Sequence, residues 1–169
     1  GVDPLPALLD FQQRLQARGV ELLIVPVPTK VSIYPDRLTD SLKPSEAPTE
    51  YLQILQHSGL RVLDLHPLFW DDREDPRHQS LYCAQDSHWT PRACQLAARA
   101  IYQTLTGADP PLPVNKFRKT STRLIRGDLA RMREDLSLAR EHITLEEVSY
   151  PAGRNSHGYD HPASEIILL

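Results

Sequence analysis

Residues 20–27, Val20-Glu-Leu-Leu-Ile-Val-Pro-Val27, form the stretch of sequence that decides the fold. Glu21 is the only charged residue within this apolar run, and prolines follow immediately. A nearly continuous apolar run that ends at prolines is typical of a strand buried on both faces of a parallel sheet. We therefore expect this run to form a buried strand of such a sheet.

The flanks of this run predict a repeating unit of helix and strand. Before it, a helix opens at Asp3, carries leucines at helical spacing and closes at Gly19. After it, a loop over residues 28–48 leads to a helix over residues 49–57 and a strand over residues 61–65. This order is that of a β-loop-α-β unit.

The rest of the chain continues the alternation. After an irregular loop over residues 67–85, a helix over residues 91–105 has one apolar face suited to packing on a sheet. The remaining expected elements are a helix over residues 129–139 capped by Asp128, and short strands at residues 143–148 and 166–169. The pattern predicts an α/β fold of three layers, with a mainly parallel sheet and helices on both faces. Functional residues of such sheets gather beyond the carboxyl ends of the strands.

Length and composition predict a single domain over residues 1–169. The chain has 169 residues, of which 40% are hydrophobic, and its 19 basic and 22 acidic residues give a formal net charge of −3. One core of ordinary size fits this length. The charge balance gives no support to nucleic-acid or anionic-membrane binding, because no basic excess or run of like charges is present.

Both ends of the chain resemble boundaries within a longer protein. The sequence starts at Gly1 without a methionine, lacks a signal-peptide pattern, and stops inside the apolar run 166–169. No stretch approaches the roughly 18 apolar residues needed to cross a bilayer. We therefore expect a domain fragment that lacks its C-terminal part.

The segment Asp86-Ser-His-Trp-Thr-Pro91 carries the candidate catalytic chemistry. In an extended segment residues i and i+2 face the same side, so Asp86 can accept a hydrogen bond from His88 and leave the far ring nitrogen free. An acid that orients a histidine, which then takes the proton of a serine, is the arrangement of Ser-His-Asp acyl transfer. The same segment is also a helix start, with Thr90 as N-cap and Pro91 as the first helical residue.

Other polar residues give weaker signals. Cys83 and Cys94 flank the motif and can either form a disulfide that braces it or remain small buried thiols. Neither has the spacing of a metal ligand, and we expect no metal and no cofactor. Arg126-Gly-Asp128 is interpreted as a helix start rather than an adhesion motif. The group formed by His157, Asp160 and His161 is interpreted as a mobile loop rather than a metal site.

Three segments in this order resemble one protein family. They are residues 22–35, which contain Pro-Val-Pro-Thr-Lys30 and Ser-Ile-Tyr-Pro35, then Val-Leu-Asp-Leu at residues 62–65, and finally the Asp86–Pro91 block. Together they resemble the SGNH-hydrolase-like domain of the alginate O-acetyltransferase AlgJ/AlgX family over nearly the whole chain. The order of the segments in this family is permuted relative to ordinary SGNH esterases, in which the serine strand comes first. In this family the Gly-Asp-Ser strand follows the histidine block. The resemblance implies that the nucleophilic serine comes directly after Leu169, outside this chain.

The resemblance implies an extracytoplasmic domain that transfers acetyl groups from a donor to an exopolysaccharide such as alginate. His88 matches the family's general base, Asp86 its orienting acid and Trp89 the accompanying aromatic residue. Lys30 is either a partner for a uronate carboxylate or a solvated surface residue. The aromatic residues in or beside the loops can stack on sugar rings or pack beneath the loops; these are Tyr34, Trp70, Tyr82 and Trp89.

Two other functions fit the same residues. One is a carbohydrate esterase of the same fold, and the other is a noncatalytic carbohydrate-binding or scaffolding domain. For the acetyltransferase, the resemblance implies a periplasmic or otherwise extracytoplasmic location, with anchoring through a segment before Gly1 as one arrangement. It also implies a polysaccharide acceptor, an acetyl donor and membrane-bound acetylation machinery as partners.

Overall fold

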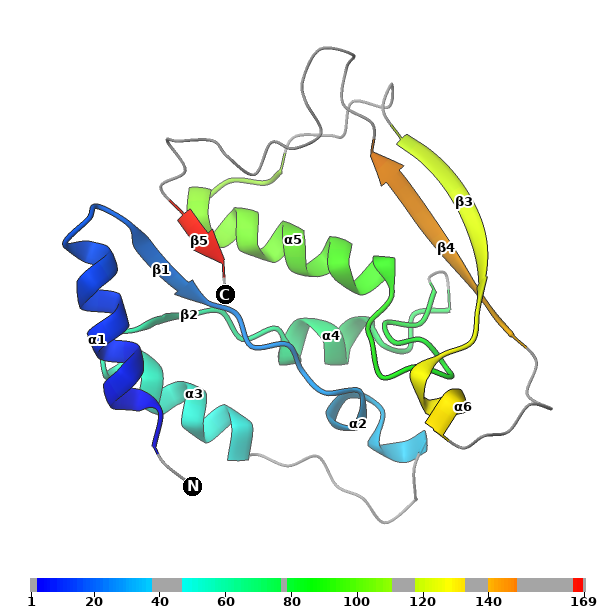
Figure 1. The fold of residues 1–169 in the computed structure, drawn as a ribbon, viewed down its shortest axis with the longest axis horizontal. Coiled ribbons are helices and arrows are strands. Elements are labelled where there is room, and N and C mark those ends of the chain that lie inside the picture. Colours follow the sequence, from blue (N-terminus) through cyan, green and yellow to red (C-terminus); the bar gives the residue numbers. More distant parts are fainter. Residues whose placement is uncertain are drawn as a thin grey trace.

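A three-stranded parallel sheet lies at the centre of the computed structural model, which describes residues 3–37, 47–76, 79–110, 118–132, 140–148 and 166–168. Strand β1 (Glu21–Ile24) lies between β2 (Arg61–Val62) and β5 (Ile166–Leu168), as Figure 1 shows. The predicted buried parallel strand is confirmed. It ends at Ile24 rather than at residue 27, since the prolines that follow have no N–H to donate to a neighbouring strand.

Helices cover both faces of this sheet, as predicted. Helices α1 (Leu5–Gln16) and α3 (Ala47–His57) pack on the face formed by Leu22 and Ile24. Helix α5 (Pro91–Thr106) contributes to a second core, against which Val25 and Leu63 pack. In Figure 1, α1 and α3 lie to one side of the strands and α5 to the other. The second core is the one that supports the candidate site, and its buried members are Ile33, Tyr34, Leu65, Phe69, Leu81, Tyr82, Ala93 and Ala97.

Two segments predicted as irregular loops contain short helices. Residues 28–48 include α2 (Lys30–Ile33) and a 3-10 helix of one turn, η1 (Pro35–Arg37). Residues 67–85 include most of α4 (His66–Asp72). The loop prediction was wrong at these places because helices this short show too little periodicity to be recognised. Burial stabilises them instead, since Ile33 in α2 and Phe69 in α4 are fully buried.

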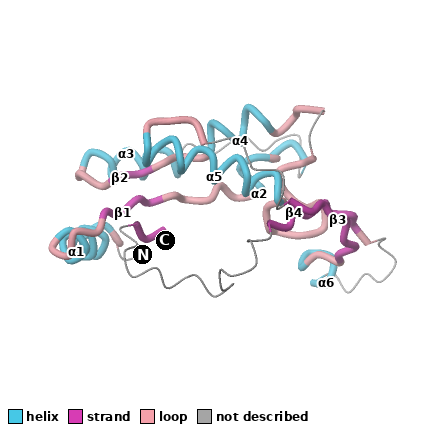
Figure 2. The backbone as a smooth tube through the Cα atoms, turned by 90° about the horizontal axis from the view of Figure 1, so that it is seen from above, coloured by secondary structure: helices cyan, strands magenta, loops and turns pink. Residues whose placement is uncertain are grey.

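A separate two-stranded antiparallel sheet follows α5. It pairs β3 (Arg118–Ile125) with β4 (Glu141–Val148), and α6 (Asp128–Met132) lies between them in the chain. Figure 2 shows this unit to one side of the parallel sheet. The predicted strand at residues 143–148 is confirmed as part of β4. Strand β3 was not predicted, because its first six residues are polar or charged and show no alternating apolar pattern.

One predicted strand is shorter in the structure, and two other predicted elements extend into residues that the structure does not describe. Strand β2 is two residues long rather than five, because Leu65 already forms the N-cap of α4. Helix α6 begins at Asp128 as expected, and residues 133–139 of the predicted helix lie outside the described residues. Strand β5 is confirmed over Ile166–Leu168, and residue 169 is not described. Within the described ranges, no helix combines the length and the apolarity required to cross a membrane.

Candidate active site

The Asp86–His88 motif lies on a tight loop between α4 and α5. The two ends of the loop are joined by an antiparallel bridge between Tyr82 and Trp89 and by a hydrogen bond from the Cys83 N–H to the His88 carbonyl oxygen at 3.2 Å. Thr90 is the N-cap residue of α5 as predicted, but its hydroxyl does not cap the helix. It donates to the Ser80 carbonyl oxygen at 2.7 Å and so closes the base of the loop.

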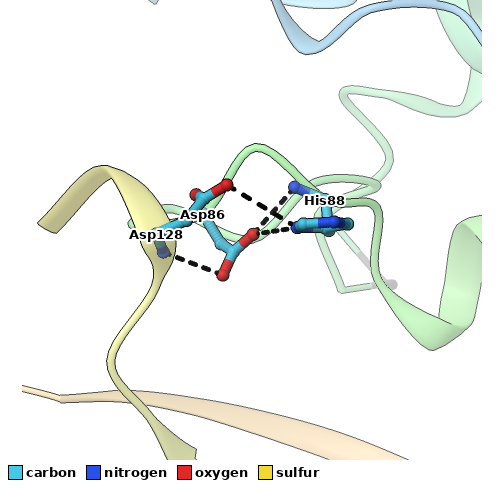
Figure 3. A group of neighbouring side chains, drawn as sticks. All are labelled: Asp86, His88 and Asp128. Carbon is cyan, nitrogen blue, oxygen red and sulfur yellow. Dashed lines mark hydrogen bonds and ion pairs between the residues drawn. The ribbon is translucent and has the colours of Figure 1, made fainter. Parts of the chain in front are cut away.

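Asp86 and His88 form the predicted pair. Asp86 Oδ1 accepts a hydrogen bond from the His88 backbone N–H at 2.9 Å and lies 2.5 Å from His88 Nδ1 (Figure 3). The Asp86 side chain is only 14% exposed, whereas the His88 side chain is 75% exposed. The acid is therefore held within the loop, and the ring is presented to solvent with Nδ1 engaged.

The electrostatics of this pair suit a base and its orienting acid. Burial by itself would raise the pKa of Asp86, but hydrogen bonds from His88 and from the Asp128 N–H outweigh it and lower this pKa from 3.8 to about 2. The hydrogen bond with Asp86 and its negative charge raise the pKa of His88 above 6.5. Asp86 is thus ionised at neutral pH and stabilises the protonated form of the imidazole.

Lys30 holds this loop from the side of α2. Its Nζ donates to the carbonyl oxygens of Cys83 at 2.6 Å, Ala84 at 2.9 Å and Asp86 at 3.0 Å. Desolvation lowers the pKa of Lys30, which reflects its half-buried position. Because an ammonium group has three N–H donors, these contacts account for all of them. The observed role is therefore to position the loop, and the suggested contact with a uronate carboxylate stays a prediction.

Glu141 holds the same loop from β4, a contact that was not predicted from the sequence. Its Oε1 accepts from the Ala84 N–H at 2.7 Å and its Oε2 from the Gln85 N–H at 3.0 Å. Asp128 at the start of α6 was expected only as a helix cap, yet its carboxylate also binds Ser87. Nothing in the local pattern around either residue indicates such a contact, since the loop is 41 to 57 residues away in the chain.

A groove with a volume of about 760 Å³ lies beside His88. Among the described residues, its walls are mostly aliphatic and aromatic, and Lys30 and Arg37 are the cationic ones. The lining residues include Val27, Pro28, Val31, Tyr82, His88, Trp89 and Leu129. Trp89 is half-buried, with its ring 6.2 Å from that of Phe69. The prediction that Trp89 accompanies the pair at the site agrees with this placement, whereas its contact with substrate stays a prediction.

Tyr34 also lines the groove, but it is a core residue. It is 2% exposed, its hydroxyl accepts from the Leu81 N–H at 3.2 Å, and the Arg37 guanidinium lies 4.1 Å from its ring centroid. The alternative in which this ring packs beneath a loop is therefore the observed one. Trp70 stacks on His66 and Arg73, and it is not among the residues that line the groove.

The two cysteines, the Arg126–Asp128 segment and the group around His157 were also interpreted from the sequence. Both cysteines are free, with Cys83 buried and Cys94 exposed, so the disulfide is not formed and only one of the two thiols is buried. Burial raises the pKa of Cys83 to about 11, which makes its thiol a poor nucleophile. Arg126-Gly-Asp128 does start a helix. His157, Asp160 and His161 lie outside the described residues.

One group of side chains has the composition of a cation site. Ligand atoms of Asp86, His88 and Asp128 all lie within 4.8 Å of one another. Nδ1 of the imidazole and Oδ1 of Asp86 already bind each other, so a cation at this point would have to displace that hydrogen bond. The observed geometry is that of an imidazole hydrogen-bonded through Nδ1 to a neighbouring carboxylate.

A parallel α/β sheet with helices on both faces and an exposed Asp–His pair beside a groove fits the class of SGNH hydrolase-like domains. Residues 3–158 match the family described as "SGNH hydrolase-like domain, acetyltransferase AlgX". The chain belongs to this family.

Known proteins agree with this assignment. The chain is 28% identical over 105 residues to the probable alginate O-acetylase AlgJ of Pseudomonas fluorescens, a match that covers 59% of this chain and 25% of that protein. It is 28% identical over 102 residues to the alginate biosynthesis protein AlgX of Pseudomonas aeruginosa, covering 56% of this chain and 21% of AlgX. The matched stretch thus spans a quarter or less of these relatives.

Solved structures show the same fold. The O-acetyltransferase domain of Pseudomonas putida AlgJ aligns with a TM-score of 0.64 at 20% identity, covering 86% of this chain and 55% of that one. Pseudomonas aeruginosa AlgX aligns with a TM-score of 0.63 at 19% identity, covering 90% of this chain and 39% of that one. Bacillus cereus PatB1 aligns with a TM-score of 0.62 at 15% identity, covering 86% of this chain and 48% of PatB1.

Proposed function

We propose that this chain is part of an O-acetyltransferase that acts on an exopolysaccharide such as alginate. The observation that carries the proposal is the imidazole of His88, oriented by Asp86 through Nδ1 and exposed at the wall of a groove. Membership of the AlgX acetyltransferase family supports the reaction class. The names of two relatives support alginate as the acceptor.

In the proposed reaction a serine outside residues 1–169 is the nucleophile. The strand order supports this origin, because β5 runs parallel to β1, so residues after β5 emerge at the same edge of the sheet as the segment that leads to Lys30. His88 takes the serine proton through Nε2 while the serine oxygen bonds to the acetyl carbonyl carbon. The donor's alcohol or thiol then leaves with that proton, and an acetyl-serine remains.

The second half of the reaction repeats this chemistry with a sugar hydroxyl. His88 takes the hydroxyl proton, the sugar oxygen bonds to the acetyl carbon, and the serine recovers its proton as it leaves. General base catalysis of this kind contributes about 10²- to 10⁴-fold. Asp86 stabilises the imidazolium formed at each step, in keeping with its low pKa of about 2.

The groove has features that suit a uronate polymer. Trp89, which is half-buried, contributes aromatic surface to its wall, and aromatic faces bind the apolar faces of sugar rings. Tyr82 also lines the groove, but it is 3% exposed and belongs to the core, as Tyr34 does. Arg37 is exposed and lines the same groove, whereas the Lys30 ammonium is taken up by the loop. We therefore assign recognition of a uronate carboxylate to Arg37, whose guanidinium can bind both carboxylate oxygens.

We further propose an extracytoplasmic, periplasmic location for the whole protein. Modification of an exopolysaccharide supports this location, as does the naming of AlgX as an alginate biosynthesis protein. The acetyl donor would be supplied by membrane-bound acetylation machinery, and attachment to the membrane would lie in a segment before Gly1.

The test uses the full-length protein that contains this chain, a chromogenic acetyl ester as donor and mannuronate oligosaccharides as acceptor. Wild-type protein should add acetyl groups to the oligosaccharide, as detected by mass spectrometry, and the acid limb of kcat/KM should lie above pH 6.5 because the pKa of His88 is raised. His88→Ala should abolish both acetate release and transfer while the protein stays folded. The matched control is His57→Ala, which removes an exposed histidine on α3 and should retain full activity.

The outcomes separate the three candidate functions. Acetate release without acetylated oligosaccharide would replace the transferase with an esterase of the same fold. Absence of turnover in wild-type protein, together with oligosaccharide binding, would indicate a binding domain. Full activity of His88→Ala would remove His88 from the mechanism.

A further inference from the structure

Helix α6 is docked directly on the loop that carries the Asp86–His88 pair. The Asp128 backbone N–H donates to Asp86 Oδ2 at 3.0 Å, and the Ala130 N–H donates to the Gln85 carbonyl oxygen at 3.3 Å. Gly127 is buried against the same carbonyl, and a Cβ at this position would lie 1.9 Å from its oxygen. The glycine is therefore needed for the close approach of the two backbones.

The Asp128 carboxylate fixes the residue between the two members of the pair. Its Oδ1 accepts from the Ser87 N–H at 2.7 Å, and its Oδ2 accepts from the Ser87 hydroxyl. Oδ2 also lies 3.8 Å from His88 Nδ1 (Figure 3). A second negative charge thus stands next to the ring nitrogen that faces Asp86.

The two oxygens of Asp86 have separate partners. Oδ1 binds the backbone N–H and the Nδ1 of His88, and Oδ2 binds the Asp128 N–H. The carboxylate cannot rotate without losing at least one of these bonds, so the orientation of the imidazole depends on where α6 is placed. A largely buried acid whose two oxygens are both hydrogen-bonded holds a fixed geometry of this kind.

We propose that Asp128 is a positioning residue of the Asp86–His88 pair, which it holds through its backbone N–H and Ser87, and that its charge favours the protonated imidazole. This inference rests on the proposed function in so far as His88 is taken as the general base. It adds a residue from a different element of the fold to the two that the motif itself supplies.

Other charged groups face the same loop and must be held constant in a test. Lys30 from α2 and Glu141 from β4 bind its backbone, and Arg37 lines the groove beside it. Asp128→Asn leaves all of these groups in place. It keeps the size of the side chain and one oxygen acceptor for Ser87, while it removes the negative charge and converts the second acceptor oxygen into an NH2 donor.

The first measurement is the titration of His88 in the full chain by ¹⁵N nuclear magnetic resonance of the ring nitrogens. Asp128→Asn should move the midpoint to lower pH than in wild-type protein, because one of the two negative charges beside Nδ1 is lost. Asp71→Asn, at an exposed position of α4, is the matched control and should leave the midpoint unchanged. An unchanged midpoint in Asp128→Asn would overturn the proposal.

The second measurement separates positioning from substrate contact. In the acetyl transfer assay, Asp128→Asn should lower kcat by about tenfold with little change in KM, as expected when one interaction made in the transition state is weakened. Asp128→Ala should lower kcat further because it also releases Ser87. A rise in KM with kcat unchanged would instead make Asp128 a substrate-binding residue and overturn the proposal.

The two measurements also separate this inference from the proposed function. The titration needs no activity, so it tests the placement of Asp128 even if His88→Ala remains active. If His88→Ala is inactive and the titration of Asp128→Asn matches that of wild-type protein, the proposed function stands and the positioning role is wrong.

Discussion

Replacement of Lys30 by methionine is expected to loosen the loop that carries Asp86 and His88. Methionine keeps most of the length and apolar surface of the lysine stem but removes the ammonium group. Three carbonyl oxygens of the loop, those of Cys83, Ala84 and Asp86, then lose their hydrogen-bond donor. The substitution therefore tests whether Lys30 positions the loop or contacts the substrate.

The magnitude follows from the burial of these bonds. The bonds to Cys83 and Asp86 are part-buried, and the bond to Ala84 is exposed and is replaced by water at little cost. A hydrogen bond to a charged group contributes about 1.5 to 3 kcal/mol. We expect a loss of about 2 kcal/mol in the free energy of unfolding, below the sum for two such bonds, since Lys30 is only half-buried and water reaches part of the loop.

Thermal unfolding followed by circular dichroism measures this loss. For a domain of this size, about 2 kcal/mol corresponds to a decrease in Tm of about 4 to 8 °C. Arg18→Met is the control, because it removes an exposed cation beyond the end of α1, and it should change Tm little. In the transfer assay, Lys30→Met should lower kcat, because the Asp86–His88 pair is no longer held in place.

The opposite pattern would refute the reasoning. If Lys30→Met melts at the wild-type temperature and only raises KM for a uronate acceptor, then Lys30 binds the substrate carboxylate. In that case the three hydrogen bonds to the loop contribute nothing measurable to its position.

Three further substitutions test other parts of the site. Because the pKa of Asp86 is lowered, its ionised carboxylate stabilises the fold above pH 3.8, and this stabilisation is lost as the pH falls toward about 2. The Tm of Asp86→Asn should therefore vary less with pH than the Tm of wild-type protein over this interval. Parallel curves of Tm against pH for the two proteins would contradict this linkage. Gly127→Ala places a Cβ 1.9 Å from the Gln85 carbonyl oxygen and should cost about 1 to 3 kcal/mol in denaturant titrations, and wild-type stability would show that the contact relaxes freely. Arg37→Gln should raise KM about tenfold for a uronate oligosaccharide but not for a neutral one; equal effects on both would exclude carboxylate recognition.

The pairing of Asp86 with His88 could be predicted from the sequence because it is local. Asp86 and His88 are two residues apart, and the hydrogen bond between them needs only the backbone of their own loop. The residues that hold this loop could not be predicted in the same way. Lys30, Asp128 and Glu141 are 41 to 57 residues away from the atoms that they bind, and each of them lies on a different element.

The sequence also identified polar residues more readily than it identified their partners. Lys30 was expected to face a substrate or solvent, and Tyr34 was considered for stacking on a sugar ring. In the structure the ammonium binds the loop and the tyrosine is buried. A charge or a ring marks a residue as capable of an interaction, but the packing of α2 against the loop selects which interaction is made.

The sequence by itself determined the class of the fold, the parallel central strand and the pairing of Asp86 with His88. These features depend on apolar periodicity and on contacts within a few residues, which a single stretch of chain records. Tertiary structure alone decided the formation of α2, the pairing of β3 with β4, and the anchoring of the site loop by α6 and β4. Those features arise where segments far apart in the chain meet, and the free energy that fixes them comes from burial and hydrogen bonds between the segments.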